Sequence, residues 1–270
     1  MNEPSAKVIR DSISPDGHRL TTMEVVMSRF VLAEFNTHRV FSRNSASSRA
    51  VPLRKQLERV GEDPALPIEW ASEKPGMQGG VELDQSALKE AVDCWNRARD
   101  EAMQCAQKLG ELGVHKSIAN RLLEPFMWHT VIVSSTEWSN FFGLRRSPLA
   151  QPEIRVAAEA MYMEYERSVP TQVGHGEWHM PYVSGDEVEL LGEDAARRVS
   201  AARCARVSYL THDGKRDPAK DLELYDRLTS AVPPHASPLE HVATPESGVP
   251  LGNFVGWRQL RHTAFASRAA

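Results

Sequence analysis

A run of cationic and hydroxyl side chains between residues 37 and 49 could bind a phosphate group. The segment reads Thr37-His38-Arg39-Val40-Phe41-Ser42-Arg43-Asn44-Ser45-Ala46-Ser47-Ser48-Arg49. A guanidinium group binds phosphate through parallel hydrogen bonds, and nearby hydroxyl and amide groups can complete the site. The same composition is typical of a solvated loop whose serines cap turns. The run by itself therefore leaves a phosphate site and a surface loop as open alternatives.

Three further segments carry groups that could do chemistry. Arg145 and Arg146 precede a predicted helix starting at Pro152, and helix starts attract anions. Residues 235–241 combine histidine, serine and glutamate, which could ligate a metal or transfer protons, or could form a turn around a buried histidine. Residues 175–179 superficially resemble a zinc protease helix, but their glycine disfavours a helix. We predict no metal site.

The composition narrows the class of protein. The chain has 270 residues, 41% of them hydrophobic, and a formal net charge of −4. These values indicate a globular protein and disfavour general nucleic-acid binding, which needs a basic surface. There is no apolar run of membrane-spanning length and no secretory signal pattern. The three cysteines form no CxxC pair, so we expect a reducing, cytoplasmic location.

Apolar periodicity and turn residues predict a mixture of a few strands and many helices. Residues 6–27 read as a hairpin around a turn at 15–17. Loops are expected at 61–82 and 170–192. Helices are predicted at 28–37, from 84 to about 112, and at 116–128, 152–170, 193–206, 218–231 and 253–262. Cys204 lies within one of these helices and is expected to be a buried, inert thiol. The fold class is therefore α/β, or α+β.

Four blocks of the sequence together resemble the flavin-dependent thymidylate synthase family. Residues 37–49, hereafter the signature segment, resemble its Arg-His-Arg-x-x-Ser-x-Asn-Glu-x-Ser-x-Arg signature, although Thr37 replaces the first Arg and Ser45 the Glu. Residues 121–125 resemble its Arg-x-x-Leu-Pro helix. The remaining blocks are residues 138–154, with Asn-Phe-Phe-Gly-Leu-Arg and Ala-Gln-Pro-Glu-Ile, and the pair 205–209 and 237–241, with Ala-Arg-Val-Ser-Tyr and Ser-Pro-Leu-Glu-His.

The order of the blocks differs from the usual order in that family. The 205–209 and 237–241 blocks usually precede the signature, and here they follow it. We therefore predict one circularly permuted domain over residues 1–270, with a central mixed sheet flanked by helices. Permutation is tolerated when the original termini lie close together at the surface. Residues 254–262 are similar to residues 30–38, and we expect Arg258 or Arg261 to supply the cation that Thr37 lacks.

The resemblance implies an enzymatic function. Family members methylate carbon 5 of dUMP, with 5,10-methylenetetrahydrofolate as carbon donor, reduced FAD as hydride donor and NADPH as reductant of the flavin. They are homotetramers with sites at subunit interfaces. The expected substrate here is a uridine monophosphate nucleotide, dUMP or UMP. The alternatives are a pyrimidine nucleotide 5-hydroxymethylase, a UMP-specific methylase of nucleoside-antibiotic biosynthesis, and a non-catalytic nucleotide- or flavin-binding homologue. We expect neither nucleic acid nor membrane as a partner.

The resemblance also assigns roles to individual residues. It implies catalytic roles for Ser47, Arg49 and Arg145. The residues expected to bind the nucleotide are Ser47, Ser48, Arg49, Arg121, Arg145 and Arg261. Those expected to bind the flavin are His38, Arg39, Asn44, Asn140, Ser208, His235 and Ser237. Besides the changes at Thr37 and Ser45, Glu34 replaces a Gln that contacts substrate, Ser134 replaces an Asn near the flavin, and Leu149 replaces a His.

Overall fold

The computed structural model describes residues 3–207, 217–248 and 252–265. Its centre is the predicted hairpin, in which β1 (Ser5–Ile13) pairs antiparallel with β2 (Arg19–Ser28). Gly17 has a φ of 82° in the connecting turn, a conformation that glycine adopts without steric cost. The hairpin expected from the sequence is therefore confirmed.

A five-stranded mixed sheet is built around this hairpin. The strand order is β3–β4–β2–β1–β5, where β3 is Ser42–Ser45, β4 is Trp128–Ser135 and β5 is Thr171–Gln172. All pairings are antiparallel except that of β1 with β5. The mixed α/β class with a central sheet is thus confirmed. Because β4 lies between β2 and β3, it fixes the position of the signature segment, which supplies β3.

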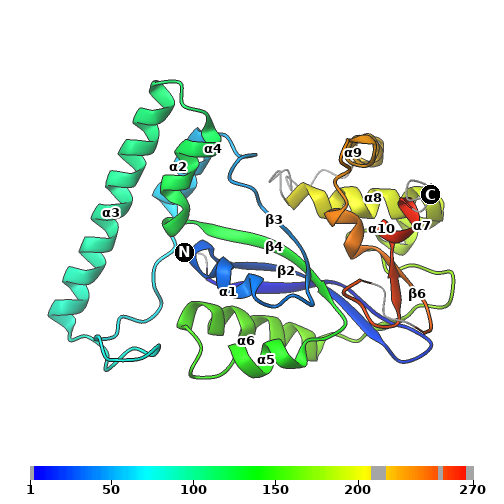
Figure 1. Ribbon diagram of the computed structural model, residues 1–270, viewed down its shortest axis with the longest axis horizontal. Coiled ribbons are helices and arrows are strands. Elements are labelled where there is room, and N and C mark those ends of the chain that lie inside the picture. Colours follow the sequence, from blue (N-terminus) through cyan, green and yellow to red (C-terminus); the bar gives the residue numbers. More distant parts are fainter. Residues whose placement is uncertain (1–2, 208–216, 249–251, 266–270) are drawn as a thin grey trace.

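Helices α5 (Ser139–Arg145) and α6 (Pro152–Arg167) cover one face of the sheet, as Figure 1 shows. Met23, Val25 and Val133 point from the strands into this layer and are fully buried. Successive side chains of a strand alternate between the faces, so Ile132 and Ser134 point to the opposite side. A short segment, η1 (Arg29–Val31) followed by α1 (Leu32–Asn36), connects β2 with the signature segment.

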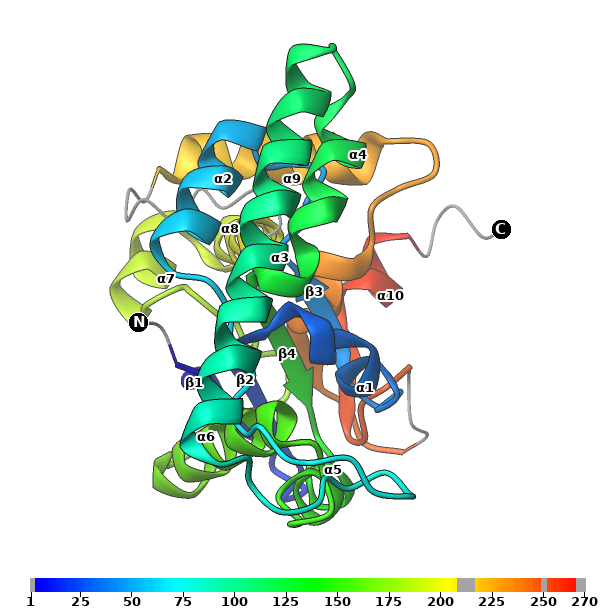
Figure 2. The same ribbon diagram turned by 90° about the vertical axis from the view of Figure 1, so that its left-hand side faces the viewer.

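A helical arm stands at one end of the sheet (Figures 1 and 2). It contains α2 (Leu53–Glu62), α3 (Gln85–Glu111), α4 (Lys116–Ala119) and the 3-10 helix η2 (Asn120–Phe126). The side chain of Asp84 accepts hydrogen bonds from two backbone amides and so caps α3. The helix predicted at 116–128 was too long, because Pro125 lies in η2 and the chain then enters β4.

The C-terminal part packs on the opposite face of the sheet, around α8. Its elements are α7 (Gly185–Leu191), α8 (Glu193–Arg206), α9 (Pro218–Ser230), η4 (Ser237–His241), β6 (Ala243–Pro245), β7 (Trp257–Gln259) and α10 (Leu260–Ala264). The prediction of a loop over 170–192 was wrong where α7 forms. The helix predicted over 253–262 is confirmed only from Leu260, where α10 begins, because β7 occupies the preceding residues and pairs with β6. Cys204 is fully buried in α8 as expected, and burial raises the pKa of its thiol.

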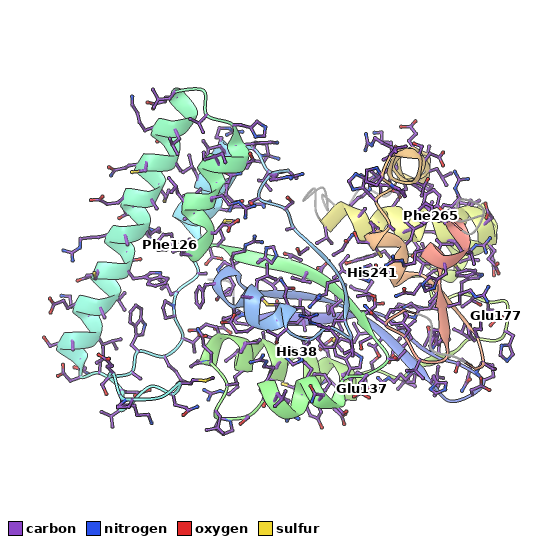
Figure 3. The ribbon with its side chains drawn as sticks, in the orientation of Figure 1. His38, Phe126, Glu137, Glu177, His241 and Phe265 are labelled. Carbon is purple, nitrogen blue, oxygen red and sulfur yellow. The ribbon has the colours of Figure 1, made fainter. Side chains whose placement is uncertain are left out.

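A chain of buried hydroxyl and imidazole groups joins this C-terminal part to the sheet. Ser12 Oγ lies 2.9 Å from Nδ1 of His179, whose Nε2 lies 2.8 Å from Thr22 Oγ1. Thr22 Oγ1 lies 2.5 Å from Ser134 Oγ, which lies 2.8 Å from Nδ1 of His241. Figure 3 places His241 on the side of the sheet nearer α8. Segments more than 100 residues apart are thereby held together by hydrogen bonds in the core.

Both imidazoles of this chain are held neutral. Burial lowers the pKa of His241 to about 3, and burial, with the positive charge of Arg10, lowers that of His179. A charged imidazole in this apolar surrounding would lose its hydration without gaining a carboxylate partner. The contacts of His241 with β4 bring the 237–241 block against the strands that carry the signature segment. The circular permutation itself stays a prediction.

Candidate functional site

The first part of the signature segment packs against α5. Nε of Arg145 donates to Nε2 of His38 over 2.9 Å, and its Nη2 donates to Oγ1 of Thr37 over 3.0 Å. The same nitrogen lies 3.4 Å from the backbone oxygen of Glu34. These four residues, Glu34, Thr37, His38 and Arg145, are called the inner cluster below. The helix α1 and the last turn of α5 place them together, and so bring two predicted blocks into contact.

His38, labelled in Figure 3, is buried and lies beside two aromatic rings. Its ring lies 5.8 Å from that of Phe41 and 4.9 Å from that of Phe141, measured between centroids. Burial, followed by the positive charges of Arg145 and Arg43, lowers the pKa of His38 to about 4. The imidazole is therefore neutral at pH 7. Because Arg145 can only donate, Nε2 of His38 is the acceptor and Nδ1 carries the proton.

The C-terminal part supports the middle of the signature segment. Asn44, on β3, donates from Nδ2 to the backbone oxygen of Cys204 over 3.2 Å. Ser42 receives a hydrogen bond of 2.9 Å from Nε2 of Gln259. Ser42, Asn44 and Gln259 are all buried. In this structure Asn44, which was predicted to bind flavin, thus braces β3 against α8.

A single carboxylate organises the next residues. Glu124 accepts hydrogen bonds from Ser48 Oγ over 3.0 Å, from Arg121 over 2.8 Å and from Arg29 over 3.1 Å. Nη1 of Arg29 also lies 3.0 Å from ring nitrogens of His129. Glu124 replaces the Leu of the Arg-x-x-Leu-Pro pattern. It therefore holds two residues predicted to bind the nucleotide, Ser48 and Arg121, at one point of η2.

The end of the signature segment opens onto a cavity of about 600 Å³, called the outer cavity below. It is lined by Ser47, Arg49, Ala50, His115, Lys116, Ser117 and His235. The structure thus brings His235, predicted to bind flavin, beside Ser47 and Arg49, predicted to bind the nucleotide. None of these lining residues is acidic. The cavity therefore offers cationic and hydroxyl groups, which suit an anionic ligand.

A second cavity lies on the other side of residues 47 and 48. Its volume is about 370 Å³, and it lies between α2 and the first residues of β4. Arg59, Glu62 and Asp63 line it together with apolar side chains such as Val60 and Phe126. Because this cavity contains carboxylates, it is less suited to an anion than the outer cavity.

The other predicted site residues lie elsewhere. Arg39 and Asn140 are exposed, near the inner cluster in sequence, and Ser237 is exposed at the start of η4. Ser208 lies outside the described residues. Arg258 pairs with Glu246, and Arg261 pairs with Glu240. A neighbouring carboxylate thus already neutralises each of the two arginines expected to replace the cation missing at Thr37.

Several residues of the site were not found from the sequence. Lys116 and His115 line the outer cavity from the turn between α3 and α4, and Arg29 and Glu124 form the carboxylate network. The only available signal for the first two was a His-Lys-Ser triplet after Gly113, at an expected helix end. Nothing in that triplet indicates which distant segment it meets.

Comparisons with known proteins agree with this fold. The structure of a UMP/dUMP methylase PolB from Streptomyces cacaoi bound with 5-Br UMP has a TM-score of 0.52 and 19% sequence identity, covering 62% of this chain and 90% of that chain. The structure of the same protein bound with 5-Br dUMP has a TM-score of 0.51 and 18% sequence identity, covering 62% of this chain and 91% of that chain. At such identity the likeness shows the fold alone. No curated protein sequence matches this chain.

The family is shown by a sequence match. Residues 10–171 match the model of the family described as thymidylate synthase complementing protein. This range covers more than half of the chain and contains the whole signature segment, the Glu124 network and α5. The inner cluster and most of the outer cavity are therefore built from residues of the matched range, and the chain belongs to the thymidylate synthase complementing protein family.

Proposed function

We propose that this protein methylates carbon 5 of a uridine monophosphate nucleotide, dUMP or UMP. The observation that carries this proposal is the outer cavity. It brings His235, which the resemblance assigns to flavin binding, beside Ser47 and Arg49, which the resemblance assigns to the nucleotide. Family membership and a fold shared with a UMP/dUMP methylase support the same reaction class.

The reaction joins the one-carbon unit of 5,10-methylenetetrahydrofolate to carbon 5, which loses its hydrogen as a proton. When bound, reduced FAD would supply the hydride that converts the transferred methylene into methyl, with tetrahydrofolate as the leaving group and NADPH as the reductant of the flavin. The residues of this chain bind and orient. Arg49 offers donors to a phosphate, Ser47 offers a hydroxyl, and Arg145 orients His38 and Thr37 by donating hydrogen bonds to both. These cationic and hydroxyl donors fit the phosphate groups that both nucleotide and FAD carry.

We further propose that the inner cluster and the outer cavity belong to one site completed between subunits of a homotetramer. Each is built from the signature segment, but the contacts that hold them are separate: α5 holds the first and η2 the second. A cytoplasmic location is part of the proposal. No helix in the described part of the chain combines the length and the apolar composition that crossing a bilayer needs.

The test is product analysis. The purified protein is first examined for a bound-flavin absorbance spectrum. It is then incubated with dUMP, UMP or dCMP together with methylenetetrahydrofolate and NADPH, and the nucleotides are identified by mass spectrometry. A 5-methyl product from dUMP or UMP is expected. A hydroxymethyl product would replace the proposal with the hydroxymethylase alternative, and flavin binding without turnover of any nucleotide would leave only a binding function.

A further inference from the structure

The positively charged groups near the signature segment differ in whether a carboxylate neutralises them. Arg121 pairs with Glu124, Arg258 with Glu246 and Arg261 with Glu240. Arg49 and Lys116 form no salt bridge with any residue that the structure describes. Both line the outer cavity, which therefore has a positive charge that its protein surroundings leave uncompensated.

Lys116 is fixed in place without being neutralised. Its Nζ donates to the backbone oxygen of Ala50 over 3.0 Å. An ammonium group has three N–H donors, so this bond to a neutral carbonyl leaves two donors and the full charge available. Because Ala50 directly follows the signature segment, the bond also holds the turn containing Arg49 against the start of α4.

His115 adds a ring N–H donor beside Lys116. Its Nδ1 accepts a hydrogen bond from the backbone N–H of Ser117 over 3.2 Å. In a neutral imidazole the other nitrogen then carries the proton, so Nε2 is a donor. Together with Arg49 and the hydroxyl of Ser47, these groups present donors from two segments to one cavity. A phosphate monoester, with several acceptor oxygens and up to two negative charges, matches this arrangement.

We propose that Lys116 binds the 5′-phosphate of the nucleotide substrate and is the second cation of the phosphate site beside Arg49. This inference rests on the proposed function, because it assumes that the ligand is a nucleoside monophosphate. It assigns to the α3–α4 turn the role that the sequence resemblance led us to expect from Arg261. Lys116 acts here as a substrate-binding residue, through direct contact with the phosphate.

The test compares dUMP with deoxyuridine, which differ only in the phosphate, and includes UMP as the second candidate substrate. Dissociation constants for dUMP, UMP and deoxyuridine are measured by calorimetry with the wild type, Lys116→Met, Arg261→Met and Lys89→Met, an exposed lysine of α3 serving as control. Lys116→Met should weaken dUMP and UMP binding by about tenfold to a hundredfold, the range for loss of one charge-assisted contact. Deoxyuridine binding should not change. Arg261→Met and Lys89→Met should change none of the constants by more than about twofold.

Further measurements separate loss of the charge at residue 116 from misfolding of the variant. Lys116→Arg keeps the charge and should restore most of the affinity, and thermal melts should show that each variant is folded. The inference is overturned if folded Lys116→Met binds dUMP and UMP like the wild type, if it loses deoxyuridine equally, or if Arg261→Met has the larger effect. If the wild type binds neither nucleotide, the proposed function fails as well. Retained binding of inorganic pyrophosphate, weakened by Lys116→Met, would then show a polyphosphate site instead and reject the monophosphate assignment.

Discussion

The two ends of the signature segment differ in how their charges are used. In the inner cluster, the guanidinium of Arg145 donates to His38 and Thr37, so its donors are directed at groups of the protein. In the outer cavity, Arg49 is exposed, and its guanidinium forms no hydrogen bond with a described residue. A motif that reads as one cationic run therefore has two roles. One end fixes local geometry, and the other leaves donors for a ligand.

The largest expected effect is a loss of unfolding free energy at acid pH, caused by the buried histidine side chains. The pKa of His38 is lowered to about 4, and those of His129 and His241 to about 3, while the unfolded value is 6.5. Above pH 6.5 these imidazoles are neutral in both the folded and the unfolded state, and their contribution to stability is complete. As the pH falls toward 4 and 3, the unfolded state binds protons that the folded state does not, and this contribution is lost. At pH 5 each fully buried ring should cost about 2 kcal/mol. Urea unfolding at pH 7.5 and 5 measures the change, and equal stability would contradict it.

Replacement of Arg145 should have the next largest effect. Arg145→Met removes the donors to His38 and Thr37, and loss of such charge-assisted bonds should lower the free energy of unfolding by about 2–3 kcal/mol. The pKa of His38 should rise, because Arg145 is the larger of the two charges that lower it. NMR titration of the His38 ring and urea unfolding measure the two effects.

The neighbouring Arg146 is the matched control for this substitution. It pairs with Glu159 at the surface and lies over the ring of Tyr162. Arg146→Met should cost less than about 1 kcal/mol, as is usual for exposed ion pairs. Similar costs for the two variants would remove the distinction between a positioning and a surface arginine.

A smaller effect is expected at the carboxylate network. Glu124→Gln keeps the shape of the side chain but removes the charge that Arg29, Arg121 and Ser48 share. Because the amide oxygen can still accept, we expect a loss of about 1 kcal/mol in unfolding free energy. Glu111→Gln, which breaks an exposed pair with Lys108, is the control and should cost under about 0.5 kcal/mol. A stabilised Glu124→Gln variant would show that the charge of this carboxylate does not stabilise the fold.

The smallest effect on stability is expected from Arg49→Met. Because the guanidinium has no described partner, the free energy of unfolding should change by less than about 0.5 kcal/mol. The same variant should bind dUMP and UMP at least tenfold more weakly, in line with loss of a charge-assisted contact. Urea unfolding and calorimetry on one preparation give both values. If Arg49→Met destabilises the fold as much as Arg145→Met, both arginines stabilise the fold, and the distinction between a positioning and a ligand-binding arginine is wrong.

Local patterns predicted much of the fold. The turn at Gly17 and the strands around it, the cap of α3 at Asp84 and the start of α6 at Pro152 all follow from neighbouring residues. The strand β4 was not predicted, because its apolar run follows η2 without a break in periodicity. The helix α2, which lies next to an extended loop, was not predicted either. Both elements depend on packing partners that are distant in the chain.

The site was predictable only in part for the same reason. The resemblance identified Arg49, Arg145 and His235, and the structure places two of them in one cavity. It could not identify which groups neutralise each cation, because Glu124, Glu240 and Glu246 belong to other segments. The charge of Lys116 is free to bind a ligand because no described carboxylate pairs with it. The spacing of residues along the chain does not indicate which charges lack such a partner.

The hydrogen bonds that brace the signature segment also order events during synthesis. Ser42 depends on Gln259 and Asn44 on Cys204, so its partners are made 160 to 217 residues later. At roughly 5–20 residues per second, the ribosome adds Gln259 at least about 10 seconds after Ser42. The helical arm and the hairpin close over short distances and can form earlier, whereas these contacts must close long loops. A nascent chain can therefore form the hairpin of the sheet before Gln259 and Cys204 brace the signature segment.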